Sequence, residues 1–322
     1  MDDFYLSVGA TALSGDRNSI LDRPWPWTAN AASHGSSSKS PSPLTRPQPR
    51  QRQSSRLCLS LGCRRQSGDV KGSFYYPSDP SSQTPQAISA NIALPLPALG
   101  ESLKIAIPGY VEGARVWFAD GKLDFSVVST PDGPALVQPT ARNPDDASAD
   151  INWDFVELTY IAGYGLFANL SFVDFLGMSL GMRLETHSSD PQLVKGIPRD
   201  AAQQVCNKLK QHSGVDRKSW ADICVPGSNG EVLRVTSLSA LLSQQPAAFG
   251  SFFSRYIERV WERYASSPLT IHSQSPAGKV SCTIDGGGLL KCNGDNQGFS
   301  KPLASNIFGC NTGPFAIRQS DN

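Results

Sequence analysis

The feature that most constrains the fold of this chain is a series of short apolar runs that begins after Ser73. The runs are split by Gly, Pro, Asn and Asp. We expect strands at Leu103–Ile107, Ala114–Phe118, Leu123–Val128, Ala135–Val137, Phe155–Tyr160 and Leu166–Phe175. Several short strands separated by turn residues are typical of sandwiches and barrels. The sequence therefore predicts a mainly β fold of one of these two kinds.

The apolar period changes from two residues to that of a helix in the second half of the chain. Pro198–His212 and Ala247–Ala265 carry apolar residues at helical spacing, and we assign both stripes to core packing. Between them, Val232–Val235 is expected to be a strand and Leu238–Leu242 a short helix or turn. We take residues 187–267 as a mixed α/β domain inserted in the β fold.

Residues 70–186 would form the first part of the β domain, and residues 268–322 would return to it. A strand at Leu269–Ser273 and a hairpin at Lys279–Cys292, turned at Asp285–Gly288, support that return. Residues 1–69 are rich in Ser, Pro, Arg and Gln and poor in periodic apolar positions. Such a segment cannot offset its ordering entropy, so we expect disorder or a wrongly assigned gene start there.

Charge and hydropathy exclude several function classes. The net charge is +1 and 18% of the residues are charged, so no global field favours nucleic acid or an anionic membrane. A nucleic-acid-binding tail in the Arg-rich first 69 residues is the weakest reading, since basic runs without a folded reader carry little information. No apolar run of about 18 residues indicates a membrane span, and Met1-Asp2-Asp3-Phe4 does not resemble the start of a signal peptide.

The cysteines nevertheless suggest an exported protein. Cys206 and Cys224 flank a predicted helix and its exit loop, and Cys282 and Cys292 flank a glycine-rich turn. Two local disulfides fit this spacing, with free buried thiols as the alternative. We expect no metal site, because the chain has no C-x-x-C pair and its histidines are not at ligand spacing: His187, His212 and His272.

Two carboxylates stand out because they lie inside apolar strand runs. Glu157 and Asp174 are seventeen residues apart, and the turn at 162–165 would bring their strands together. Glycoside hydrolysis needs such a pair, one carboxyl to protonate the leaving oxygen and one to activate water. Strand alternation places Asp174 on the wrong face, so a bulge or a strand end must turn it outward. The alternative is a pair of surface carboxylates at strand ends.

A family resemblance strengthens the catalytic reading. The run Gly113-Ala114-Arg115-Val116-Trp117-Phe118, followed by Gly133–Pro139 and Asn143-Pro144-Asp145, resembles the opening of the laminaripentaose-producing β-1,3-glucanases, glycoside hydrolase family 64. The segments Asn152–Thr159 and Phe167–Phe175 resemble the family strands that bear the general acid and the general base. The similarity covers residues 70 to 316.

The resemblance implies a thaumatin-like β sandwich or barrel that carries a smaller mixed α/β domain, with a groove between them for a β-1,3-glucan chain. Glu157 would be the general acid and Asp174 the base of an inverting, endo-acting hydrolysis. Thr159, Phe167 and Ser171 match family positions that line the groove, although core packing is the alternative for Phe167. The resemblance implies a secreted monomer with β-1,3-glucan as its partner, without cofactor, nucleic acid or membrane.

The chain departs from the family pattern at both ends, where the N-terminal strands and the segment after Gly313-Pro314-Phe315 have no match. Cys310 is thereby left without an evident partner. The alternative function is therefore a non-catalytic β-1,3-glucan-binding thaumatin-like protein or an inactive fragment.

Overall fold

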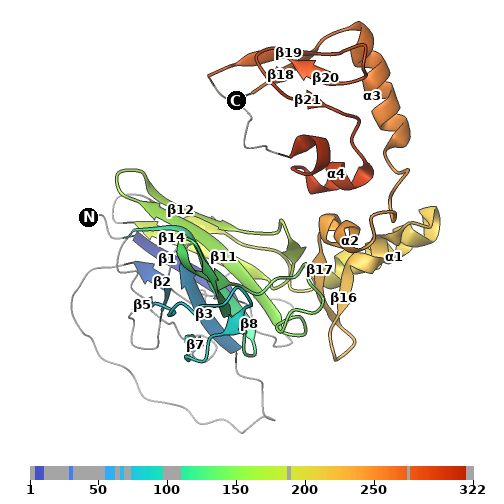
Figure 1. Ribbon diagram of the computed structural model, residues 1–322. Coiled ribbons are helices and arrows are strands. Elements are labelled where there is room, and N and C mark those ends of the chain that lie inside the picture. The colour runs from blue at the N-terminus through green and yellow to red at the C-terminus, as the bar shows by residue number, and fades with distance from the viewer. Residues whose placement is uncertain are drawn as a thin grey trace, which may run out of the picture. The chain divides into compact units, whose positions relative to one another are not determined.

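The computed structural model describes residues 4–10, 29–31, 55–61, 66–68, 74–96, 110–186, 190–273 and 276–316 (Figure 1). They fall into two compact units. The first is Met1–Asn207 with Cys224–Val235, and the second is Lys208–Ile223 with Thr236–Asn322. The strand expected at Leu103–Ile107 lies outside the described residues.

The first unit is built on one long antiparallel sheet, which contains the predicted site residues Glu157, Thr159 and Phe167. Its strand order is β12, β11, β8, β3, β4, β5, and β7 pairs with β3. The strands are β3 Ser55–Leu61, β4 Gln66–Gly68, β5 Phe74–Tyr75, β7 Ala93–Pro95, β8 Val111–Asp120, β11 Asn152–Ile161 and β12 Gly165–Leu170.

Three smaller sheets belong to the same part of the chain. One has the order β15, β14, β1, β2, with β1 Phe4–Ala10, β2 Ala29–Ala31, β14 Leu180–Thr186 and β15 Gln192–Val194. The next has the order β10, β9, β6, with β6 Gln86–Ala87, β9 Ser126–Thr130 and β10 Gly133–Val137. The third has the order β13, β17, β16, with β13 Phe175–Leu176, β16 Cys224–Pro226 and β17 Val232–Thr236.

Much of β8 and β11 is buried on both faces, which explains their nearly continuous apolar runs. Alternate residues of β8 and β11 point to opposite faces. One set packs with Leu180 and Met182 of β14: Val116, Phe118, Val156 and Leu158. The other set packs with Phe125 and Phe175: Trp117, Ala119, Trp153 and Phe155. The result is layered open sheets, so the predicted mainly β class with a mixed α/β part is confirmed and the layers are those of a sandwich.

The second unit combines helices with a small sheet. The helices are α1 Ala201–Asp216, which begins in the first unit, α2 Leu238–Gln244, α3 Ser254–Ser266 and α4 Ala304–Gly309, with 3-10 turns η1 Ser219–Ile223 and η2 Gly313–Phe315. The sheet has the order β18 Leu269–His272, β19 Lys279–Ile284, β20 Leu290–Cys292, β21 Gly298–Phe299. Aromatic rings contact one another in its core: Trp220, Phe249, Phe252, Phe253 and Phe308.

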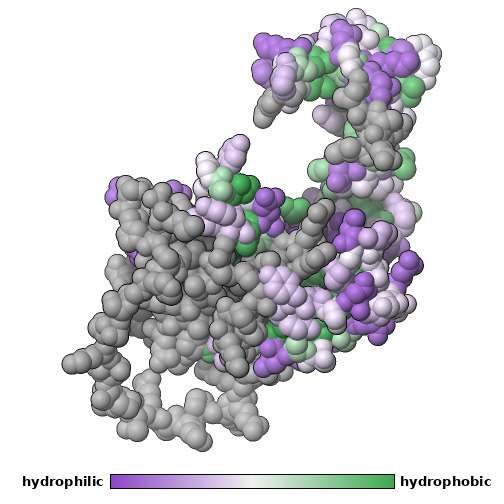
Figure 2. Space-filling model, turned by 60° about the vertical axis from the view of Figure 1, so that its left-hand side comes forward, coloured by the Kyte–Doolittle hydropathy of each residue, from purple (hydrophilic) through white to green (hydrophobic). Residues whose placement is uncertain are grey.

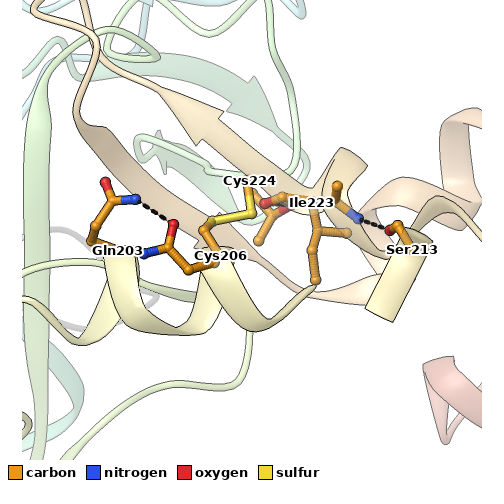
Figure 3. The surroundings of a disulfide bond; sticks show 8 residues. Gln203, Cys206, Ser213, Ile223 and Cys224 are labelled. Atoms are coloured by element: carbon orange, nitrogen blue, oxygen red, sulfur yellow. Dashed lines mark hydrogen bonds between the residues drawn. A yellow bond between two sulfur atoms is a disulfide. The ribbon is translucent and has the colours of Figure 1, made fainter. Parts of the chain in front are cut away.

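Both expected disulfides are present. Cys206 of α1 is bonded to Cys224 at the start of β16, and Cys282 of β19 to Cys292 of β20. Figure 3 shows the first of these, with the buried Cys206 sulfur joined to Cys224 beside Ile223. Cys310 is a free, exposed cysteine.

The division into domains that we expected from the sequence remains a prediction. The structure groups β18–β21 with the second unit, whereas the sequence analysis returned residues 268–322 to the β domain. Within the first 69 residues, β1 to β4 are strands, and the expectation of disorder stays a prediction for the rest, which lies outside the described residues.

In the described part of the chain, no helix is long and apolar enough to cross a membrane. The same residues hold no cluster of three His, Cys, Asp or Glu side chains arranged for a metal ion. On the face seen in Figure 2, hydrophobic and hydrophilic residues are interspersed over the described surface.

Candidate active site

Glu157 lies on β11, the second strand of the long sheet, between charged and polar neighbours on both adjacent strands. In the register of the sheet, Arg115 of β8 and Asn169 of β12 stand directly opposite it. Arg115 donates two hydrogen bonds to Glu157 Oε1, from Nε at 3.1 Å and from Nη2 at 2.9 Å. Asn169 Nδ2 donates to Glu157 Oε2 at 3.2 Å. The carboxyl group is therefore held from two strands at once.

The Arg115 guanidinium is itself fixed by further contacts. Its Nη1 donates to Gln138 Oε1 at 3.0 Å, and its central carbon lies 4.4 Å from the centre of the Phe155 ring. The Arg115 and Glu157 side chains are each 32% exposed, so the pair lies at the surface above the aromatic core. A carboxyl group in this position is accessible to a substrate while its orientation is constrained.

Asp174 lies outside the strands because β12 ends early. The expected strand Leu166–Phe175 divides into β12, which ends at Leu170, and β13, which begins at Phe175. The four residues between them do not follow strand alternation. Alternation therefore no longer forces Asp174 onto the face opposite Glu157. Phe175 is buried, and its ring lies 4.7 Å from Trp153 and 6.2 Å from Phe155.

These ring contacts join the segment of Asp174 to the face of β11 that carries Glu157. Phe155 shares its side of β11 with Glu157, two residues later, while Phe175 directly follows Asp174. The Asp174 side chain is 42% exposed, and its Oδ1 lies 3.7 Å from Arg142 Nη1.

One short segment contacts both carboxylate sites. Gln138 accepts from the arginine that holds Glu157, and Arg142 pairs with Asp174. Four residues of extended chain span at most about 14 Å. The same short segment thus links the partner of Glu157 to the partner of Asp174.

The structure also groups two of the three weaker candidates with Glu157. Thr159 is paired with Phe167 in the same register that pairs Glu157 with Asn169, so all four share one face. Phe167 is 60% exposed, which removes core packing as the reason for its aromatic ring. Thr159 Oγ1 accepts from Gly113 N at 2.9 Å, where Gly113 adopts a φ of 60° beside a register shift in the β8–β11 pairing.

Thr159 keeps its hydroxyl proton available for another acceptor after that bond. Ser171, the third candidate, follows β12 directly and is half-buried. It lies in the chain between Asn169 and Asp174.

Sequence reasoning assigned no role to Arg115 or Asn169. The signal for Arg115 was present, because a charged residue interrupts an otherwise buried strand. Such a residue is costly unless paired, and its cross-strand partner is Glu157. Asn169 carried no comparable signal, since polar residues at an edge strand are ordinary.

β11 has a second acidic residue, which is buried and does not share the face of Glu157. Asp154 is 1% exposed, and burial raises its pKa to about 8, despite the opposing effects of the Phe155 backbone N–H and Arg234. Arg234 of β17 lies with its guanidinium 4.8 Å from the Trp153 ring and donates to Ile151 O. Burial lowers the pKa of Arg234 to about 10, which leaves it charged at neutral pH. Strand alternation separates Asp154 from Glu157, so we assign it to the packing of β13 and β17 against the sheet.

Comparisons with known proteins identify the family of this chain. A model of the Glyco_hydro_64 family, described as β-1,3-glucanase, matches residues 64–322. A laminaripentaose-producing β-1,3-glucanase, solved in complex with laminaritetraose, is 26% identical over 81% of this chain and 71% of its own, with a TM-score of 0.68. A β-1,3-glucanase domain of family 64 from Clostridium beijerinckii shares the fold, at 17% identity over 83% of this chain and 72% of its own, with a TM-score of 0.55. No curated protein matches.

Proposed function

The chain belongs to glycoside hydrolase family 64, the β-1,3-glucanases, and from that premise we propose that it cleaves β-1,3-glucan with Glu157 as general acid and Asp174 as general base. The family assigns the reaction, the hydrolysis of β-1,3-glucan. The assignment of the two residues rests on the site, above all on one segment: its Gln138 accepts from Arg115, the partner of Glu157, and its Arg142 pairs with Asp174.

The roles follow from what each carboxyl group contacts. Glu157 has one oxygen occupied by Arg115 and the other near Asn169, so a proton on the second oxygen can face a leaving group. Asp174 lies beside Arg142 and is assigned as the base that accepts a proton from water. Cleavage with inversion requires carboxyl groups about 6.5 to 9.5 Å apart, which leaves room for the attacking water.

The bonds balance in a single displacement. The Glu157 proton moves to the glycosidic oxygen as the bond from C1 to that oxygen breaks. Water attacks C1 from the opposite side and gives a proton to Asp174. The product therefore has the α configuration at the new reducing end.

The exposed neighbours provide contacts to the sugar chain. The Phe167 ring would offer an apolar face, and Thr159 and Ser171 would donate or accept hydrogen bonds. We propose that the chain acts internally on the polymer, as a secreted monomer; the two disulfides support an oxidising compartment.

Release of reducing ends from insoluble β-1,3-glucan tests the assignment. We expect Glu157→Gln and Asp174→Asn each to lower the rate by about 10²- to 10⁴-fold, with glucan binding in the same tubes retained. Glu185→Gln and Asp124→Asn are matched controls, because both acids form exposed ion pairs elsewhere, with Arg183 and Lys122. Binding without release by the wild-type chain would contradict the proposal and support a glucan-binding protein.

A further inference from the structure

The contacts of Glu157 are unequal on its two oxygens. Oε1 receives both Arg115 bonds, at 3.1 and 2.9 Å, whereas Oε2 receives only the weaker donor Asn169, at 3.2 Å. An arginine has donors and no acceptor, so the oxygen that it holds cannot be the one that carries a proton toward Arg115. Oε2 is thus the oxygen on which a proton can sit.

We propose that Arg115 is a positioning residue that fixes Glu157 with Oε2 as the proton-donating oxygen and stabilises the carboxylate as the proton leaves. This inference rests on the proposed function, in which Glu157 is the general acid. When Oε2 is protonated, Asn169 either turns its amide so that the amide oxygen accepts a hydrogen bond from that proton, or releases Oε2 to the leaving group.

The benefit is specific to the transition state. As the Oε2 proton moves to the glycosidic oxygen, negative charge develops on the Glu157 carboxyl group. Two N–H donors of a cation already point at that group, so no reorganisation is needed at that moment. An interaction that strengthens as charge develops raises kcat rather than substrate affinity.

The guanidinium is suited to this task by its shape as well as its charge. The planar group makes three hydrogen bonds, two to Glu157 and one to Gln138, and its central carbon lies over the Phe155 ring. A lysine at the same position would keep the charge, but a single ammonium group cannot reproduce the fork or the stacking. Charge and fork can therefore be tested separately.

The charged surroundings of Glu157 are few in the described residues of this site. Arg115 faces it from β8, while β12 presents the neutral Asn169 and the segment after β10 presents the neutral Gln138. Arg142 and Asp174 form their own pair beyond that segment and partly cancel each other. Removal of Arg115 is thus the largest change of charge that a single substitution can make next to Glu157.

The test compares Arg115→Gln and Arg115→Lys across a pH range. Without the positive charge, Glu157 holds its proton to higher pH. We therefore expect Arg115→Gln to lower kcat on soluble β-1,3-glucan about 10- to 100-fold and to move the alkaline limb of the rate profile up by about one pH unit. Arg115→Lys should lower kcat about tenfold and leave the alkaline limb of the rate profile at its wild-type pH. Arg183→Gln is the matched control, because it breaks an exposed Arg–Glu pair of β14, 2.6 Å long, and should change neither.

A substrate with an acidic leaving group separates a positioning role from a structural one. The dinitrophenolate group of a dinitrophenyl β-glycoside of a laminari-oligosaccharide leaves without being protonated. The defect of Arg115→Gln should therefore be at least tenfold smaller on this substrate. The Arg115→Gln/Glu157→Gln double variant should be no slower than Glu157→Gln alone, because both act through one proton.

Equal loss on both substrates with an unmoved pH limb would overturn the inference, as would full activity of Arg115→Lys. The two proposals can fail separately. If Glu157→Gln retains the wild-type rate, the proposed function fails. If Glu157→Gln is inactive on glucan while Arg115→Gln leaves the limb in place, only the role of Arg115 fails.

Discussion

Replacing Asp154 by Asn should remove a large part of the pH dependence of stability. Asp154 is buried, and its pKa is raised from 3.8 to about 8. Between these values the unfolded chain has an ionised Asp154 and the folded chain a protonated one, so the folded state binds one more proton. The stabilising effect is complete below pH 4 and is lost as pH rises toward 8.

The size of the effect follows from linkage. Within this window the free energy of unfolding falls by about 1.4 kcal/mol per pH unit. The wild-type chain should thus lose about 3 kcal/mol more than Asp154→Asn between pH 5 and pH 7. Asparagine is nearly isosteric and does not titrate, and every other titrating group is common to both chains.

The assay is urea unfolding at pH 5, 6 and 7, followed by tryptophan fluorescence, since Trp153 adjoins Asp154 and is fully buried. The prediction concerns the slope with pH and not the absolute stability, which the substitution also lowers. Equal slopes for the two chains would refute the reasoning, because they would mean that Asp154 does not carry the extra proton in the folded state.

Three further predictions concern the turn after β13, the disulfide of the second unit and the substrate face. Gly177→Ala should destabilise the chain by about 1 to 3 kcal/mol, because its Cβ would lie 2.8 Å from the Phe175 ring; an unchanged melting temperature would contradict that contact. Cys282→Ser with Cys292→Ser opens a loop of ten residues and should cost about 3 kcal/mol, measured by urea unfolding against the oxidised wild-type chain; equal stability of the two chains would contradict this. Phe167→Ala should raise KM for β-1,3-glucan roughly fivefold with kcat retained, for a loss of about 1 kcal/mol of apolar contact; an unaltered KM would exclude the ring from the substrate face.

The parts of the fold that the sequence predicted well are those where local pattern and tertiary packing agree. Strands at Ala114–Phe118 and Phe155–Tyr160 lie within β8 and β11, because apolar residues are needed on both faces of a covered sheet. The two disulfides were also predicted, because each joins cysteines that are close in sequence and flank a turn or helix.

Prediction failed where tertiary packing overrides local pattern. The apolar run after Leu170 predicts a continuous strand, yet Phe172 and Val173 are 40% and 81% exposed. The chain bends there so that Phe175 can enter the aromatic core. The residues of this bend are of types that favour strands, but they do not form a strand in the structure.

The helix expected at Ala247–Ala265 shows the same limit. Only Ser254–Ser266 is helical, and the preceding residues form turns that bury Phe249. Tyr256 was assigned to the apolar stripe but is 59% exposed. Helical spacing alone cannot tell a stripe that packs from one that includes a turn, because both can bury the same aromatic residues.

The candidate site was partly predictable. Glu157 and Asp174 were identified by their place in apolar runs and by the family resemblance, which also identified Thr159 and Phe167. Arg115 requires the register of β8 against β11, which a single sequence does not provide. Cross-strand partners of this kind are decided by long-range pairing.

The configuration of the first product tests the central claim most directly. Proton NMR of laminarihexaose during the first minutes of hydrolysis distinguishes the α from the β anomer before mutarotation mixes them. If Glu157 protonates the leaving oxygen while Asp174 activates water, the wild-type chain should release the α anomer first. Early release of the β anomer would mean a covalent intermediate on one of the two carboxylates, and would contradict the account.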